Sequence, residues 1–211
     1  MKKIIGVLSQ KGGVGKSTIA RLIGVEYARM NHKVLIADMD NSQSTCYEWN
    51  LQRGNTNIEP IIDARKYDEV NQAISDSKNH DILIFDGAPH ATRVTKQIAE
   101  VSNLILLPTG SSLEDLKPQI RLAHGLISSD IPKDKIAFIL SKINSSDSEL
   151  EDVRDYISNS GYHIFKEFIP EKIAFRQAIA EGKMITETKY NTLNQRCLEL
   201  FNSISKKIEK L

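Results

Sequence analysis

The sequence lacks most features that mark secreted, membrane or metal-cluster proteins. Only two of its 211 residues are cysteine, too few for a disulfide framework and in keeping with a reducing compartment. Cys46 and Cys197 stand in no ligand spacing, which argues against an iron–sulfur cluster. No apolar run approaches the ~18 residues of a membrane span, and no signal-peptide pattern precedes the first apolar run. We therefore expect a cytoplasmic protein.

The sequence also lacks an excess of either charge. Its 28 basic and 27 acidic side chains nearly cancel, so net charge alone does not indicate a nucleic-acid partner. The distribution is less even, because residues 1–40 carry 7 basic and 3 acidic side chains, residues 41–160 carry 12 and 18, and residues 161–211 carry 9 and 6. Both ends are basic and the middle is acidic. The length fits one α/β domain, so we expect a single domain over residues 1–211.

What the sequence does contain is a regular alternation of apolar runs and helical patterns. Runs that are apolar throughout are typical of strands buried on both faces, and amphipathic patterns between them predict helices. The runs lie at residues 4–8, 34–37, 82–85, 103–108, 135–141 and 165–169. A further run at 58–62 contains Pro60, which favours an edge strand. We predict an α/β fold with a mainly parallel sheet of about seven strands and helices on both faces.

The first apolar run leads directly into a glycine-rich loop. The loop and the first helical turn comprise Lys11, Gly12, Gly13, Val14, Gly15, Lys16, Ser17 and Thr18. The three glycines allow unusual backbone conformations and bring N–H groups close to an anion. Lys16 would reach the β- and γ-phosphates, Ser17 would bind Mg²⁺, and Thr18 would add a hydroxyl near the α-phosphate. The loop thus predicts a nucleotide phosphate site, with an ordinary surface turn as the alternative.

The loop departs from the plain phosphate-loop pattern, because Gln10 stands where that pattern requires glycine. With Lys11 placed ahead of the glycines, it resembles the deviant Walker A motif of the ParA/MinD family of ATPases. In that family the early lysine reaches the nucleotide of a partner subunit. The resemblance therefore implies that Lys11 acts in catalysis across a homodimer that forms when ATP is bound.

Two aspartates, Asp38 and Asp40, follow the second apolar run. The family has two aspartates with this spacing, and the resemblance implies that Asp40 positions the attacking water. The proline that usually follows in the family is absent here. The alternative is that both carboxylates cap a helix that begins near Ser42.

The apolar run at 82–85 ends in Asp86. This is the Walker B arrangement, in which the carboxylate holds the water shell of Mg²⁺ at the end of a strand. Gly87 would offer its backbone N–H to the γ-phosphate. By resemblance to later elements of the family, Asn144 and Pro170 would lie near the nucleotide base. For Asn144 ordinary turn chemistry is the alternative.

The resemblance covers nearly the whole chain and is closest to the short plasmid-partition ParA proteins. It implies an ATPase that uses ATP and Mg²⁺, dimerises with ATP, and binds nucleoid DNA without regard to sequence. A ParB-like centromere-binding protein would stimulate hydrolysis, and the cycle would segregate plasmid or chromosomal DNA. DNA contact requires clustered basic side chains, for which a solvated polar face is the alternative. The candidates are Lys183, Lys189, Arg196, Lys206, Lys207 and Lys210.

Two other function classes stay open. A MinD-like membrane-cycling ATPase ends in an amphipathic helix that settles on lipid, and an apolar stripe at 193–208 with basic neighbours permits this. The stripe begins early and is sized to pack on the sheet, so we do not expect a membrane partner. A metabolic or cluster-assembly enzyme would need a substrate pocket or a cysteine pair, and the sequence displays neither.

Overall fold

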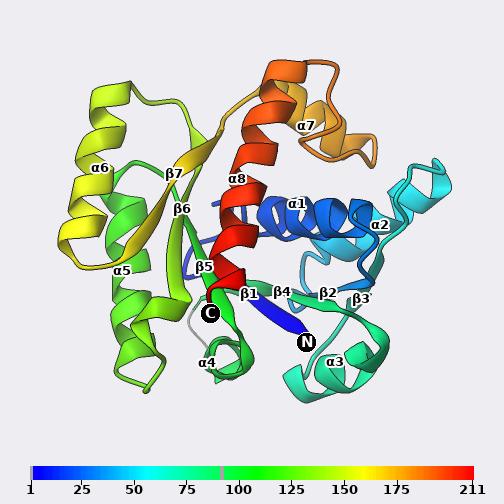
Figure 1. The fold of residues 1–211 in the computed structure, drawn as a ribbon, viewed down its shortest axis with the longest axis horizontal. Helices are drawn as coiled ribbons and strands as arrows, with labels where there is room; N and C mark the ends of the chain where they lie inside the picture. The colour runs from blue at the N-terminus through cyan, green and yellow to red at the C-terminus, as the bar shows by residue number, and fades with distance from the viewer. Residues whose placement is uncertain (1, 91–92) are drawn as a thin grey trace.

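Seven parallel strands form one sheet at the centre of the computed structural model, which describes residues 2–90 and 93–211 (Figure 1). The strand order is β3-β2-β4-β1-β5-β6-β7. The strands are β1 (Lys3–Ser9), β2 (Val34–Asp38), β3 (Asp63–Lys66), β4 (Ile82–Pro89), β5 (Leu104–Thr109), β6 (Ile136–Ile143) and β7 (His163–Pro170). The α/β fold with a parallel sheet is therefore confirmed.

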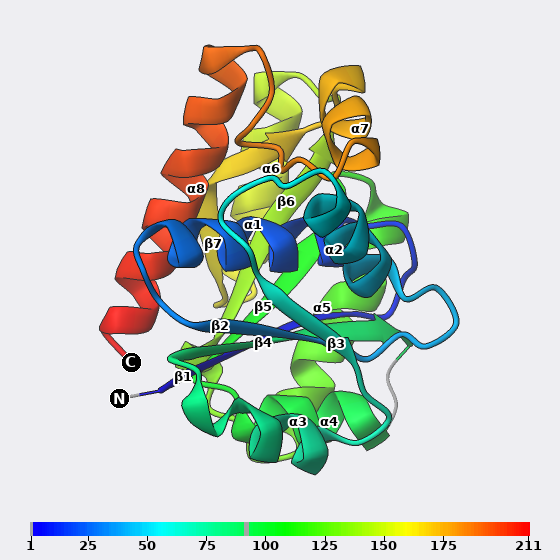
Figure 2. The same ribbon diagram turned by 90° about the vertical axis from the view of Figure 1, so that its right-hand side faces the viewer.

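Helices connect the strands on both faces of the sheet. The α-helices are α1 (Lys16–Arg29), α2 (Thr45–Asn55), α3 (Val70–Asp76), α4 (Arg93–Val101), α5 (Leu113–Ile127), α6 (Asp147–Asn159), α7 (Ile173–Ala180) and α8 (Asn191–Glu209). Two short 3₁₀ turns, η1 (Ser77–Asn79) and η2 (Lys133–Lys135), precede β4 and β6. Figure 2 shows α1, α2 and α8 above the sheet and α3 and α4 beneath it.

The central strands are buried on both faces because alternate residues enter two different cores. In β4, Ile82 and Ile84 belong to one apolar cluster, whereas Leu83 and Phe85 belong to the other. Side chains from α1, α2, α7 and α8 complete the first cluster, and side chains from α3, α4, α5 and α6 complete the second. Cover on both faces explains why the strands are apolar throughout instead of alternating.

The residues that carry chemistry gather where the central strands end. Asp38, the last residue of β2, pairs in register with Asp86 of β4, and Val7 of β1 pairs with Asp86 from the other side. Parallel strands end at the same edge of a sheet, where ligands collect in this class of fold. The glycine loop that follows β1 therefore lies beside both aspartates.

The prediction of an edge strand over residues 58–62 is wrong. The edge strand is β3, which begins at Asp63 and pairs with β2. The residues before it bend around Arg53, whose guanidinium donates to the carbonyl oxygens of Glu59 and Pro60 at 2.8 and 3.0 Å. These carbonyls are satisfied by a side chain instead of a neighbouring strand.

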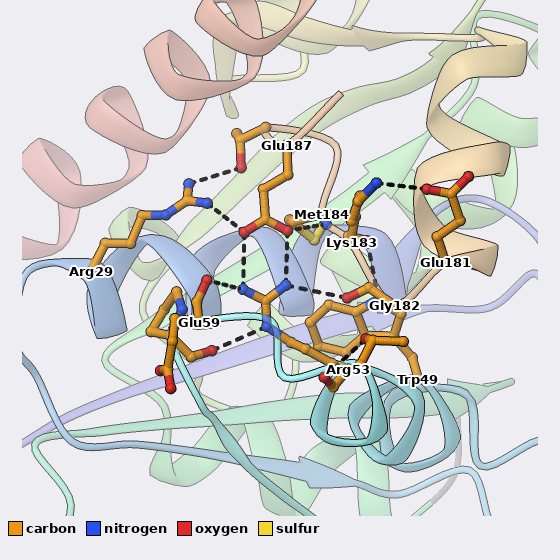
Figure 3. Close-up of polar contacts among 12 residues, drawn as sticks. Arg29, Trp49, Arg53, Glu59, Glu181, Gly182, Lys183, Met184 and Glu187 are labelled. Atoms are coloured by element: carbon orange, nitrogen blue, oxygen red, sulfur yellow. Dashed lines mark hydrogen bonds and ion pairs between the residues drawn. The ribbon is translucent and has the colours of Figure 1, made fainter. Parts of the chain in front are cut away.

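Arg53 is the centre of a buried polar cluster that joins α2 to the segment before α8 (Figure 3). Its guanidinium is 1% exposed and forms a two-point ion pair with Glu187, with N–O distances of 2.8 and 2.9 Å. A further bond to the Gly182 carbonyl measures 3.2 Å. With the bonds to Glu59 and Pro60, every N–H of the guanidinium has an acceptor. We call Arg53, Glu187 and these three carbonyls the Arg53 cluster.

The last helix, α8, packs its apolar side against the fold. The buried residues of the stripe are Cys197, Leu200, Phe201, Ile204 and Ile208. They join the same core as α1 and the inner side of β7. Among the residues that the structure describes, no helix combines the length and the apolarity needed to cross a membrane.

Candidate functional site

A cavity of about 240 Å³ opens over the glycine loop. Its lining consists of Gly12, Gly13, Gly15, Lys16, Ser17, Thr18, Arg21, Asp40, Gln43, Thr45, Gly87, Pro89, Lys142 and Ile179. The structure thus brings most of the predicted loop together with Asp40 and Gly87. Arg21, Thr45 and Lys142 were not identified from the sequence, because no motif marks them and only the fold brings them here.

The loop backbone has the conformation that a phosphate cradle requires. Gly13 and Gly15 have φ values of 78° and 97°, in the left-handed region that favours glycine. A Cβ at Gly15 would overlap the Ser141 hydroxyl, whereas a Cβ at Gly12 or Gly13 would meet nothing within 4 Å. The left-handed φ therefore favours glycine at position 15, where a side chain would also displace the Ser141 hydroxyl. The open space at positions 12 and 13 leaves peptide N–H groups accessible to an anion.

Lys16 lies in the cavity at the start of α1 and is 7% exposed. Its Nζ donates to the Lys11 carbonyl at 3.2 Å. Burial lowers the pKa of Lys16, and the charges of Asp86 and Asp40 oppose that shift. A desolvated ammonium beside a helix N-terminus is well placed to bind a negatively charged ligand.

Lys11 lies outside this cavity. It is not among the described lining residues, and its side chain is 40% exposed. Its Nζ forms an ion pair with Asp115 at 2.6 Å and donates to the Glu114 carbonyl at 3.2 Å. Val14 is buried and likewise does not line the cavity. The side chain of Lys11 is therefore held at the start of α5, outside the cavity of its own chain.

Asp86 is almost completely buried, with 1% of its surface exposed. Its Oδ1 has no hydrogen-bond partner within the described part of the chain, although a buried carboxylate oxygen normally has one. Burial raises the pKa of Asp86 to about 6, and the Ser17 side chain opposes the shift. One carboxylate and one hydroxyl fit Mg²⁺, which is usually shared between few protein oxygens and ligand phosphates. Among the described residues, no group of three or more His, Cys, Asp or Glu side chains could hold a metal ion.

The two aspartates after β2 have different environments. Asp38 is fully buried, and its Oδ2 accepts two N–H groups of the first turn of α2 at 2.8 and 3.1 Å. It therefore caps α2, as the alternative interpretation proposed. Asp40 accepts the backbone N–H and the hydroxyl of Ser42, and it also lines the cavity. Its role toward water stays a prediction.

Asn144 and Pro170 do not line the cavity, so far as the described residues show. Asn144 is exposed and Pro170 is buried at the end of β7. Lys142, with a left-handed φ of 58°, and Ile179 of α7 provide the lining on this side of the site. The assignment of Asn144 and Pro170 to the nucleotide base stays a prediction.

The basic candidates for DNA contact separate into two groups. Lys206, Lys207 and Lys210 of α8 line a groove of about 560 Å³ together with His163 and Lys166 of β7. We call this the α8–β7 groove. The remaining candidates lie elsewhere: Arg196 borders a smaller hollow with Lys166, Lys183 pairs with Glu181 at 2.7 Å, and Lys189 packs over Tyr190. The groove is the larger concentration of positive charge.

Comparison with known proteins agrees with this geometry. The profile of the CobQ/CobB/MinD/ParA nucleotide binding domain matches residues 5–185. Protein ParA from Rhizobium radiobacter is 28% identical over 109 residues, which cover 50% of this chain and 47% of that protein. An iron–sulfur cluster carrier protein from Rickettsia bellii is 58% identical over 40 residues, or 19% of this chain and 13% of that protein. The chain thus spans less than half the length of these curated relatives.

A solved structure supports the fold over the full length. The septum site-determining protein MinD from Pyrococcus horikoshii, in complex with Mg-ADP, has a TM-score of 0.74 and 18% identity. The alignment covers 98% of this chain and 97% of that one. The profile match covers most of the chain and includes the loop, Asp40 and Asp86. The chain therefore belongs to the CobQ/CobB/MinD/ParA family of nucleotide-binding domains.

Proposed function

We propose that this protein is a ParA-type partition ATPase. ATP and Mg²⁺ would join two copies into a homodimer that binds nucleoid DNA without regard to sequence. Hydrolysis, stimulated by a ParB-like centromere-binding partner, would release the DNA and move a plasmid or chromosome in the cytoplasm. The observation that carries the proposal is the position of Lys11, which belongs to the loop motif yet lies outside the cavity of its own chain.

Each residue of the site has a separate role in the proposed hydrolysis of ATP. Lys16 and the loop N–H groups would bind the phosphates, while Ser17 and Asp86 would hold Mg²⁺, which offsets phosphate charge when bound. Asp40 orients the attacking water from the cavity wall, and Lys11 reaches the phosphates of the partner subunit. Catalysis then rests on positioning and charge stabilisation, without a covalent intermediate.

The dimer is tested by sedimentation with and without ATP. The wild type should shift from monomer to dimer with ATP, whereas Lys11→Ala should bind ATP and stay a monomer. Lys117→Ala, at an exposed lysine of α5, is the control and should dimerise normally. A Lys11→Ala protein that dimerises as well as the wild type would contradict the proposal.

DNA binding is tested at the α8–β7 groove. Replacing Lys206, Lys207 and Lys210 together by Glu should abolish ATP-dependent DNA binding, because phosphate neutralisation drives binding that ignores sequence. The matched control replaces three exposed lysines, one each of η1, α4 and α5, by Glu: Lys78, Lys96 and Lys117. DNA binding is measured by gel shift over a range of salt concentrations. An equal loss of DNA binding in both triple variants would show that the α8–β7 groove is not the DNA-binding surface.

The membrane-cycling alternative receives less support from α8. The apolar residues that would enter lipid are buried against α1 and β7. Release of α8 would expose the core beneath it. Sedimentation with anionic liposomes and ATP separates the two functions, since ATP-dependent pelleting with lipid would favour the alternative.

A further inference from the structure

The two oxygens of the Asp86 carboxylate have different surroundings. Oδ1 has no partner among the described residues, while Oδ2 lies 3.1 Å from the sulfur of Cys46. Both side chains are buried, with exposures of 1% and 0%. A carboxylate can rotate about its terminal bond, so a donor that fixes one oxygen also decides where the other oxygen points.

The thiol of Cys46 is the donor in this contact. An ionised carboxylate only accepts hydrogen bonds, and a protonated thiol is a weak donor. A cysteine thiol, whose ordinary pKa is about 8.5, keeps its proton at neutral pH. Cys46 and Asp86 therefore form an S–H···O contact, with the proton on sulfur.

The position of this thiol is set by Asp38, at the end of β2. The backbone N–H of Cys46 donates to Asp38 at 2.8 Å, in the first turn of α2. The sulfur also lies 3.7 Å from the carbonyl oxygen of Ser17, the residue expected to share the cation. Cys46 thus touches β2, α1 and β4 at the same point, next to Thr45 on the cavity wall.

We propose that Cys46 is a positioning residue for the cation site, whose thiol holds Oδ2 of Asp86 so that Oδ1 is presented to Mg²⁺. This inference rests on the proposed binding of a Mg²⁺–nucleotide complex. It assigns a role to Asp38 as well, because that carboxylate holds the helix turn that carries the thiol. Partners that orient a ligating carboxylate typically change metal affinity by about 10- to 100-fold when they are removed.

The test measures Mg²⁺ dependence instead of turnover. A fluorescent ADP analogue is bound at fixed concentration, and Mg²⁺ is titrated against Cys46→Ala, Cys46→Ser and wild type. Cys46→Ala should need about 10-fold more Mg²⁺ for half-maximal binding. Cys46→Ser, which restores a donor, should lie closer to the wild type than to Cys46→Ala.

The second cysteine supplies the control for lost packing. Cys197 of α8 is also fully buried, and Cys197→Ala should leave the Mg²⁺ midpoint unchanged. The unfolding temperatures of Cys46→Ala and Cys197→Ala in EDTA show whether both lose comparable stability. If Cys46→Ala fails to fold, Cys46→Val replaces it, because valine has a similar volume and no donor.

Two results would overturn the inference alone. One is an unchanged Mg²⁺ midpoint in Cys46→Ala or Cys46→Val, and the other is a Cys46→Ser protein as impaired as these variants, which would indicate packing and not donation. Absence of Mg²⁺-dependent nucleotide binding in the wild type would instead overturn the proposed function, and this inference with it.

Discussion

The nucleotide cavity and the Arg53 cluster both include buried polar groups, yet the hydrogen bonding of these groups differs between the two regions. In the Arg53 cluster every N–H of the guanidinium has an acceptor and the ion pair with Glu187 has two points of contact (Figure 3). Of the five buried side-chain atoms without a partner in the described part of the chain, three lie at or beside the cavity: the Nε of Arg21, the Oδ1 of Asp86 and the hydroxyl of Ser141.

The difference shows which of the two regions is built for a ligand. A buried polar group without a partner costs roughly 1–3 kcal/mol, so a fold keeps several of them together only where something else satisfies them. The Arg53 cluster needs nothing from outside and holds α2 against the segment before α8. We expect mutations in the cluster to reduce stability and mutations in the cavity to reduce binding.

The largest effect is expected from Arg53→Ala. Removing one partner of a buried ion pair leaves the charge of Glu187 unpaired, so the free energy of unfolding should fall by about 3–5 kcal/mol. Urea denaturation gives the value. Arg65→Ala is the control, because Arg65 pairs with Asp63 at the surface and its removal should cost no more than about 1 kcal/mol. An equal loss of stability in Arg53→Ala and Arg65→Ala would show that the Arg53 cluster stabilises the fold no more than a surface ion pair does.

Lys16→Met should reduce nucleotide affinity and leave stability unchanged, the reverse of what is expected for Arg53→Ala. Nucleotide affinity should fall by about 100-fold, the equivalent of about 3 kcal/mol, because a charged donor to the phosphates is lost. Stability of the nucleotide-free protein should not fall, since burial already lowers the pKa of Lys16 and disfavours its charge. Calorimetric titration with ADP and thermal unfolding measure the two quantities. A destabilised Lys16→Met protein would show that Lys16 stabilises the fold, as the residues of the Arg53 cluster do.

The pH dependence of stability should show the raised pKa of Asp86. Its pKa in the folded protein is raised to about 6, so the folded state binds this proton more tightly than the unfolded chain does. In EDTA, protonated Asp86 therefore adds to the free energy of unfolding. This added stability is present in full below about pH 4 and is lost as pH rises through 6. Relative to Asp86→Asn, the wild type should therefore lose about 3 kcal/mol of stability between pH 4 and pH 7. Parallel pH curves for the two proteins would contradict the assignment.

The smallest effect is expected from Trp49→Phe, at the border between the two regions. The indole N–H of Trp49 donates to the Lys183 carbonyl at 3.1 Å, and its ring lies against Arg21 and Arg53. Phenylalanine keeps an aromatic ring and removes the donor, so stability should fall by about 1 kcal/mol with nucleotide affinity unchanged. A loss of affinity comparable to that of Lys16→Met would show that the border belongs to the cavity.

Local sequence accounted for the strands and for the loop. The fully apolar runs became parallel strands, and Lys16, Ser17, Asp40 and Gly87 came together as expected because strand order places their loops at one edge. Asp86 lies at that same edge, as an aspartate that ends an apolar run should, while its role toward Mg²⁺ stays a prediction. The mistaken strand at 58–62 shows the limit, since its carbonyls are satisfied by Arg53.

The sequence by itself determined the parallel α/β fold and the phosphate loop, because strand periodicity and glycine conformation depend on neighbouring residues. Only the tertiary structure decided that Cys46 meets Asp86, that Lys142 borders the cavity, and that Arg53 meets Glu187. Arg53 and Glu187 are 134 residues apart, and no local pattern specifies which distant partner will satisfy a buried charge. That choice follows from the path of α2 and α8 over the sheet.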